Sequence, residues 1–172
     1  VTGNLEVYGP LMEQTFARLG IPAFIDRKRD VLKNPFVEFV RALLAAVQED
    51  FSYESMFRLL RSGMTGVTME ETDRLENYVL ARGIRGISGW KKEWRYPLKG
   101  MEEEELSELN ELRKRALIGL QDLRSVLTKK DTDAETMSRA LYGYIAELGI
   151  QEELKVRKEA FEAEGNLSLA KE

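Results

Sequence analysis

Residues 34–47, NPFVEFVRALLAAV, decide the class of fold that we expect for this 172-residue chain. Asn34 is a favourable N-cap, and Pro35 suits the first helical position, where a missing backbone N–H costs nothing. The apolar residues recur at the spacing of one helix face: Phe36, Phe39, Val40, Leu43, Leu44 and Val47. The stretch therefore predicts an amphipathic helix whose apolar side needs other helices to cover it.

On the N-terminal side of this helix we expect a strand–helix–strand lead-in over residues 1–33. Residues 1–3 resemble the remnant of a strand, and a helix should begin near Pro10 and stop at Gly20. Residues 21–25, IPAFI, are short, apolar and partly β-branched, which predicts a second strand; its proline places it at a sheet edge or a strand start.

On the C-terminal side, helix signals follow one another along the chain. Ser52 should cap a helix that Gly63 ends. Thr68 and Glu71 form a capping box, which predicts a helix that runs to Gly83. These signals favour a helical subdomain rather than a sheet.

Residues 102–130 predict one long helix with a near-heptad apolar face. Its two seams, the second interrupted by Arg113, consist of Leu109, Ala116 and Leu123, and of Leu106, Leu120 and Leu127. A face of this length is typical of a helix that packs against neighbouring helices or covers a partner.

Two further helices should complete the chain. Thr132 and Glu135 form a second capping box, whose helix should end at Gly149, and a polar helix follows over residues 152–164. The fold class that we expect is mainly α, a multi-helix domain with a small β remnant near the N-terminus.

Charge is unevenly distributed along the chain, although its net value is only −4. Up to Gly100 there are 15 basic and 13 acidic residues, whereas the remainder has 11 basic and 17 acidic residues. The polarity reverses near residues 97–100, which we take as the boundary between a helical subdomain at 34–100 and an acidic long-helix subdomain at 101–172. We expect these parts to form one compact unit.

Composition excludes several kinds of chemistry. The chain has no Cys and no His, so it cannot supply a disulfide, an iron–sulfur cluster, a zinc site or a Ser–His–Asp triad. No glycine pair is followed by the Lys-Ser/Thr of a P-loop, so we expect no ATP hydrolysis by this segment. No apolar run approaches the roughly 20 residues of a membrane span. The chain opens at Val1, which suggests a segment of something larger.

Three groups of carboxylates resemble metal sites, and each has a simpler explanation. The acidic run at 102–105 suits the positive end of a helix dipole. Residues 131–135, DTDAE, open like a calcium loop but lack its glycine and its final glutamate. Asp26, Asp30 and Glu38 are interleaved with cations, as in a polar loop. We therefore expect neither a metal nor a cofactor in this segment.

Residues 82–99 carry the one functional signal with some force. Six cations stand against the single acid Glu93, and three aromatic residues are interspersed. Cations neutralise phosphates and aromatic rings stack on unpaired bases, which favours nucleic-acid binding. The candidate DNA-binding residues are Arg82, Arg85, Trp90, Lys91, Lys92, Trp94, Arg95 and Tyr96, with Lys99 as the sixth cation. In the alternative, Trp90 and Trp94 form one buried helix face and the cations only solvate the other side.

One stretch carries a resemblance to a known family: residues 73–86, DRLENYVLARGIRG, followed by Trp90. It resembles the AddB (RexB-related) subunit of bacterial AddAB-type helicase–exonucleases, and more loosely the chain resembles UvrD-like superfamily 1 helicases. The resemblance covers residues 1–100 well and extends to YGPLME at 8–13, LGIPAFID at 19–26, NPFVEF at 34–39 and YESMFRLL at 53–60.

The resemblance implies a fragment of a cytoplasmic subunit whose assembly unwinds and degrades double-strand-break ends for homologous recombination. The family's ATP, Mg²⁺ and iron–sulfur sites belong to motifs that this chain lacks, so no catalytic residue is carried over. DNA and the companion AddA-like subunit are the implied partners, without a membrane. Two roles stay open: a non-catalytic subdomain that contacts DNA, or a structural domain that docks on the companion through residues 106–127. An independent enzyme is the third alternative.

Overall fold

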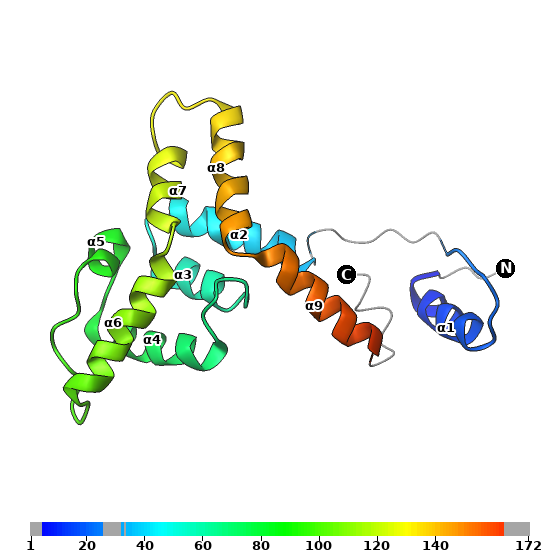
Figure 1. The fold of residues 1–172 in the computed structure, drawn as a ribbon, viewed down its shortest axis with the longest axis horizontal. Coiled ribbons are helices and arrows are strands. Elements are labelled where there is room, and N and C mark those ends of the chain that lie inside the picture. The colour runs from blue at the N-terminus through cyan, green and yellow to red at the C-terminus, as the bar shows by residue number, and fades with distance from the viewer. Residues whose placement is uncertain (1–4, 26–31, 33, 164–172) are drawn as a thin grey trace. The chain divides into compact units, whose positions relative to one another are not determined.

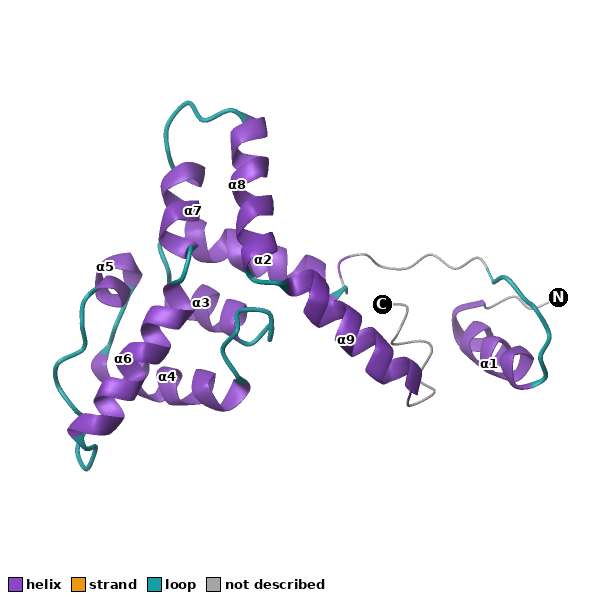
Figure 2. Cartoon of the chain, viewed as in Figure 1, coloured by secondary structure: helices purple, strands orange, loops and turns teal. Residues whose placement is uncertain are grey.

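The computed structural model describes residues 5–25, 32 and 34–163, and divides the chain into two compact units, Val1–Lys33 and Asn34–Glu172. Among the described residues helices dominate and no strand occurs, which confirms the mainly-α class (Figure 2). The first unit contains α1, Leu5–Arg18 (Figure 1). The second contains α2 Pro35–Gln48, α3 Tyr53–Leu60, α4 Met69–Arg82, α5 Gly86–Lys91, α6 Glu103–Leu117, α7 Leu120–Leu127, α8 Ala134–Glu147 and α9 Ile150–Ala163. None of the described helices is long and apolar enough to cross a bilayer.

In the first unit, the expected strand at residues 21–25 is wrong. These residues have no regular structure, because an extended segment becomes a strand only when a neighbour pairs with it, and the described residues offer none. The start of α1 also differs from expectation, since Pro10 lies inside the helix and not at its beginning. The stop is confirmed: Gly20 adopts φ +68° and the N–H of Ile21 bonds back into the helix. The remnant expected at 1–3 lies outside the described residues.

In the second unit, the local capping signals are confirmed. The Asn34 side chain accepts two backbone hydrogen bonds from the first turn of α2, at 3.0 and 3.3 Å. The Ser52 side chain caps α3, and Thr68 and Glu71 exchange both bonds of the capping box at 3.2 and 2.9 Å. Gly83 ends α4 with φ +61°, a conformation that glycine adopts without strain.

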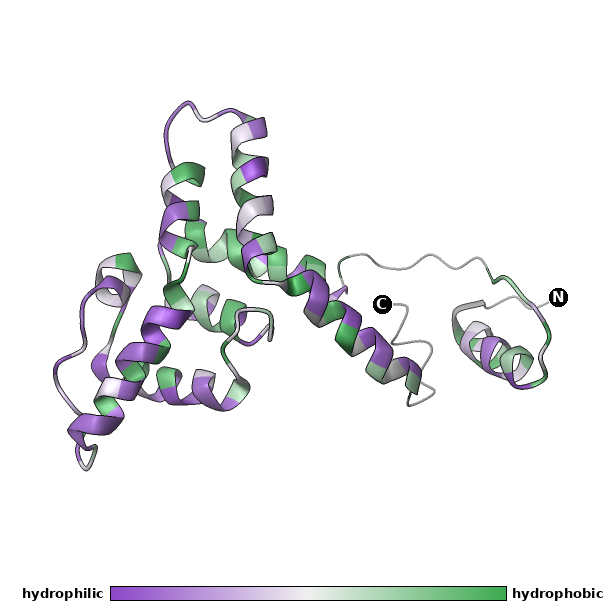
Figure 3. Ribbon diagram, viewed as in Figure 1, coloured by the Kyte–Doolittle hydropathy of each residue, from purple (hydrophilic) through white to green (hydrophobic). Residues whose placement is uncertain are grey.

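The core of this unit is built on α2 and α3, where apolar residues concentrate (Figure 3). Phe39, Leu43 and Ala46 of α2 are completely buried, as the spacing predicts. Leu44 is an exception at 40 % exposure, because it lies at the edge of the apolar stripe and not at its centre. The helix that opens the fold is therefore its central packing element.

The single long helix expected over residues 102–130 is wrong. The structure breaks it between α6 and α7, where Gly119 adopts φ +69°. A Cβ atom at Gly119 would lie 2.9 Å from the ring of Tyr144 on α8, so the close approach of α8 requires glycine here. The break turns α7 to pack beside α8 (Figure 1).

The C-terminal helices form close to the expected positions. The cap of α8 is Asp133 and not Thr132, because the Asp133 carboxylate accepts the N–H of Thr136 at 2.8 Å. This bond, with one from the Thr136 hydroxyl, lowers the pKa of Asp133. The final helix α9 begins at Ile150, two residues before the expected position.

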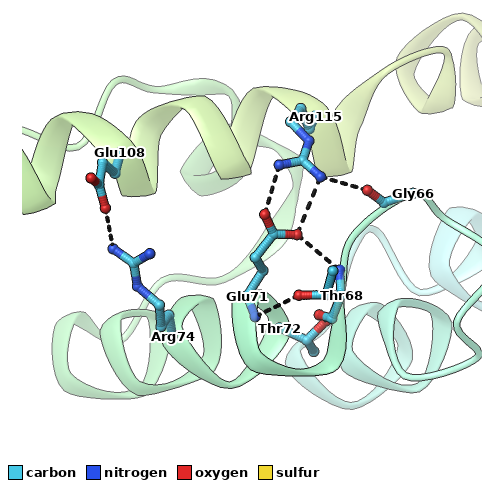
Figure 4. A network of polar contacts seen from close by, with 7 residues as sticks. All are labelled: Gly66, Thr68, Glu71, Thr72, Arg74, Glu108 and Arg115. Atoms are coloured by element: carbon cyan, nitrogen blue, oxygen red, sulfur yellow. Dashed lines mark hydrogen bonds and ion pairs between the residues drawn. The ribbon is translucent and has the colours of Figure 1, made fainter.

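No domain boundary separates α4 from α6 near residue 100, because the two helices pack together within the second unit. Figure 4 shows their polar contacts: the Arg115 guanidinium bonds both oxygens of Glu71, at 2.8 and 3.2 Å, and the carbonyl of Gly66 at 2.6 Å. Arg74 and Glu108 form a second ion pair at 2.6 Å. The acidic α6 is thus fixed against α4, and the connection between them is held at both ends.

Candidate nucleic-acid interface

The basic–aromatic segment occupies the end of α4, the short α5 and the connection from α5 to α6 (Figure 1). Within it, Trp90 is completely buried and Trp94 is 6 % exposed. The ring of Trp90 lies 5.8 Å from Trp94 and 6.0 Å from Phe57, and Trp94 stacks on Tyr78 at 4.8 Å. Base stacking by these two tryptophans is therefore corrected: they form the buried face of the alternative interpretation, because the core takes up both indole rings.

Asn110 of α6 holds the backbone of this segment at Trp94. Its amide nitrogen donates to the carbonyl of Trp94 at 2.8 Å, and its oxygen accepts the N–H of Trp94 at 3.0 Å. One side chain thereby satisfies both peptide groups of a buried residue, as a neighbouring strand would. This pairing fixes the position of the chain that follows α5.

Arg113, one turn further along α6, fixes the end of α5. Its Nη1 donates to the carbonyls of Trp90 and Lys91 at 2.7 and 3.1 Å, and its Nε donates to Asn110 at 3.2 Å. The guanidinium also lies 5.7 Å from the centre of a Trp94 ring. Arg113 is only 5 % exposed, so its hydrogen bonds are made in the protein interior.

The charge of Arg113 contributes to the electrostatics of the surface above it. Burial lowers its pKa, an effect opposed by the negative charges of Glu93 and Glu111, but a guanidinium with an ordinary value of 12.5 stays protonated. Within the described part of the chain, no carboxylate forms an ion pair with Arg113. Its positive charge therefore adds to the potential around the α5–α6 connection.

From the opposite side, α4 holds the same connection. The Tyr78 hydroxyl and the Arg82 guanidinium both donate to the carbonyl of Tyr96 at 2.8 Å, and Arg82 also donates to the carbonyl of Pro97. Arg82 thus contacts backbone and serves first to position the connection. We call residues 91–99 the basic loop; its backbone is clamped by α6 and by α4.

The remaining candidate residues of the basic loop point to solvent. Lys91, Lys92, Arg95 and Tyr96 are exposed, as is Lys99. Arg95 pairs with Glu93 at 3.2 Å, but both side chains are largely exposed and such pairs contribute little. The structure thus brings these cations onto one short, held segment.

Arg85 lies apart from this group, at a cavity of about 580 Å³ between the α2–α3 turn and the end of α4. The cavity is also lined by the carboxylates of Glu49, Asp50 and Glu54, and Asp50 pairs with Arg124 at 2.8 Å. Three carboxylates repel phosphate, so the anion-attracting surface ends on this side and Arg85 stands at its border.

Metal sites find no support among the described residues, where no cluster of three or more acidic side chains is placed to hold an ion. Glu38 instead pairs with Arg58 and Arg41, both at 2.7 Å, and the hydrogen bond from Arg58 lowers its pKa. Asp26 and Asp30 lie outside the described residues. The carboxylates that suggested chemistry serve local structure where the structure describes them.

Sequence reasoning missed Asn110 and treated Arg113 only as an interruption of an apolar seam. The signal was present: two polar residues, three apart, lie on the apolar side of a helix. Such residues are buried only when partners satisfy them. Their partners are backbone groups of a distant segment, which no local pattern reveals.

Comparison with known proteins finds no protein-family model that matches the chain. It does find curated relatives that are named as the AddB component of an ATP-dependent helicase/deoxyribonuclease. That of Acetivibrio thermocellus is 41 % identical over 100 % of the chain, that of Lachnoclostridium phytofermentans 38 % over 96 %, and that of Clostridium novyi 36 % over 100 %.

The chain spans only 14–16 % of the length of these relatives. Identity of this level, maintained over nearly the whole chain in each of the three relatives, is well above chance similarity. The chain therefore belongs to the AddB family of ATP-dependent helicase/deoxyribonuclease subunits, of which it represents one segment.

Proposed function

We propose that this segment is a non-catalytic helical module that contacts the phosphate backbone of DNA through the basic loop. The observation that carries the proposal is a loop held from two helices while Lys91, Lys92 and Arg95 stay exposed. Holding the backbone in advance reduces the entropy lost on binding. The relatives' name, a helicase and deoxyribonuclease subunit, makes DNA the polyanion of choice.

The location of the charges supports phosphate contact over a general attraction to anions. The chain as a whole has a net charge of −4, so DNA gains only where cations are locally concentrated. The buried charge of Arg113 reinforces that concentration from below, and the acidic cavity beside Arg85 limits it. A polyanion is thereby directed to one part of the surface.

Chemistry would belong to other parts of the longer subunit. We assign ATP, Mg²⁺ and iron–sulfur binding to those parts, together with the nuclease reaction, and give this segment contact and scaffolding. Its place would be in a cytoplasmic complex with an AddA-like subunit that processes double-strand-break ends for homologous recombination.

The alternative role, docking on the companion subunit through the seam at residues 106–127, has lost its main argument. Leu109, Ala116 and Leu120 are at most 3 % exposed, because the seam is covered by the chain's own core. DNA contact is therefore the role that the geometry favours.

The test compares two triple variants of the 172-residue chain in binding to a fluorescein-labelled 20-base-pair duplex. K91A/K92A/R95A removes the exposed cations of the basic loop. K129A/K130A/R139A is the matched control, with two adjacent exposed lysines and an arginine paired with a glutamate, Glu135. Affinity is measured by anisotropy between 50 and 200 mM salt.

We expect the basic-loop variant to bind more weakly and to reduce the salt slope by up to about 2.7, at about 0.9 for each lost phosphate contact. The control should match the unaltered chain to within about twofold. Equal affinities and slopes for the two variants would refute the proposal.

A further inference from the structure

Tyr96 differs from the other aromatic residues of its region. Its side chain is 73 % exposed, whereas Tyr78, Trp90 and Trp94 are buried. Exposure of a large aromatic ring is costly in water, and it is unusual next to so many buried rings. Nothing in the core requires Tyr96, so its ring is available for a ligand.

The backbone of Tyr96 is, by contrast, firmly held. Its carbonyl accepts hydrogen bonds from Tyr78 and Arg82, both at 2.8 Å, and Arg82 also bonds the next carbonyl. Pro97 follows directly and restricts Tyr96 to extended conformations. A ring with two torsions on a fixed backbone loses little freedom when it stacks.

The neighbours of Tyr96 define the ligand. Arg95 precedes it and Lys92 and Lys99 lie within four residues, all exposed. Cations that follow a phosphate backbone, combined with an exposed aromatic ring, are the elements by which proteins bind single strands. In a duplex the bases are already stacked on each other, so the ring gains nothing.

We propose that Tyr96 stacks on an unpaired base and makes the basic loop selective for single-stranded nucleic acid. This inference rests on the proposed function, because the phosphates must first be drawn to the loop. Stacking depends on the ring and not on base identity, so the site reads strandedness rather than sequence.

The experiment measures binding of the 172-residue chain to three labelled probes: dT15, an abasic 15-nucleotide strand with the same phosphates, and a 15-base-pair duplex. The variants are Y96S, the conservative Y96F, and Y142S as a matched control at another exposed tyrosine. Circular dichroism melting confirms that each variant is folded.

We expect Y96S to lose about 5- to 150-fold in affinity for dT15, the range of one base–aromatic stack. Its affinity for the abasic strand and for the duplex should change less than twofold. Y96F should retain binding to dT15, because the ring and not the hydroxyl stacks, and Y142S should resemble the unaltered chain.

Unchanged binding of dT15 by Y96S, or an equal loss on the abasic strand, would overturn the stacking assignment. Since K91A/K92A/R95A weakens all three probes if the loop binds phosphates, that variant reports on the proposed function separately. The two proposals can therefore fail independently.

Discussion

At the scale of single residues, Arg113 links the aromatic core to the candidate surface. Its guanidinium donates to the carbonyls of Trp90 and Lys91 and lies against Trp94. Those carbonyls are shielded from water, so Arg113 is their means of satisfaction. The same contacts determine where Lys91 leaves the helix.

We predict that R113M lowers the free energy of unfolding by about 2 kcal/mol. The reason is that buried backbone carbonyls left without a donor cost about 1–3 kcal/mol. Urea unfolding followed by tryptophan fluorescence measures the change. K114M, at the exposed neighbouring position, is the control and should stay within about 0.5 kcal/mol of the unaltered chain. A similar stability for R113M and K114M would contradict the role of Arg113.

A second prediction concerns Glu71, which joins the cap of α4 to Arg115. Hydrogen bonds from Arg115 and from the Thr68 N–H lower the pKa of Glu71 below its ordinary value of 4.5. A lowered pKa in the folded state means that the ionised form stabilises the fold. This contribution is complete above pH 4.5 and is lost as the pH falls through the lowered value.

E71Q should therefore be less stable than the unaltered chain at pH 7, with a smaller difference at pH 3, as measured by thermal unfolding across this range. Some acid dependence will remain in E71Q, because Glu38 and Asp133 also have lowered pKa values. E108Q, in the exposed pair with Arg74, is the control. Parallel pH profiles for E71Q and the unaltered chain would refute the assignment.

Residue-scale reasoning from sequence succeeded for caps and failed for buried polar contacts. Asn34 and Thr68 act within their own helix, so the local pattern contains everything needed. Asn110 bonds a residue 16 positions away, and Trp90 and Trp94 have the same sequence pattern whether they face water or core. Only the packed structure separates those possibilities.

At the scale of elements, the break between α6 and α7 shows tertiary packing overriding a helix pattern. The apolar seams continue from Leu106 to Leu127, so periodicity predicts one helix. Gly119 permits the left-handed turn, and Tyr144 from α8 fills the space that a side chain would need. The sequence contained the glycine but not the contact that gives it a purpose.

We predict opposite effects for alanine at two glycines. G119A should destabilise the fold by about 2 kcal/mol or more, because alanine is strained at φ +69° and its Cβ would meet the Tyr144 ring at 2.9 Å. G143A, inside α8 with nothing within 4 Å, should stabilise it by about 0.5–1 kcal/mol through helix propensity.

Thermal unfolding of the two variants provides the comparison. The matched substitution removes any general effect of replacing glycine by alanine. Equal or like-signed shifts in melting temperature would show that Gly119 is not a required break between α6 and α7.

At the scale of the whole molecule, charge is separated along the chain: the excess of acid lies beyond Gly100, while the basic loop ends just before it. The acidic α6 packs behind the loop and supplies Asn110 and Arg113 from its inner side. An acidic surface around a basic loop restricts where a polyanion approaches. This arrangement is the physical basis for assigning contact, and not catalysis, to the segment.

The most direct test of the basic loop is amide chemical-shift mapping of the ¹⁵N-labelled chain as dT15 is added. The proposal predicts that the largest shifts at saturation fall on residues 91–99, while α8, Ala134–Glu147, is an internal reference with small shifts. Shifts in the basic loop no larger than those of α8 would contradict the account.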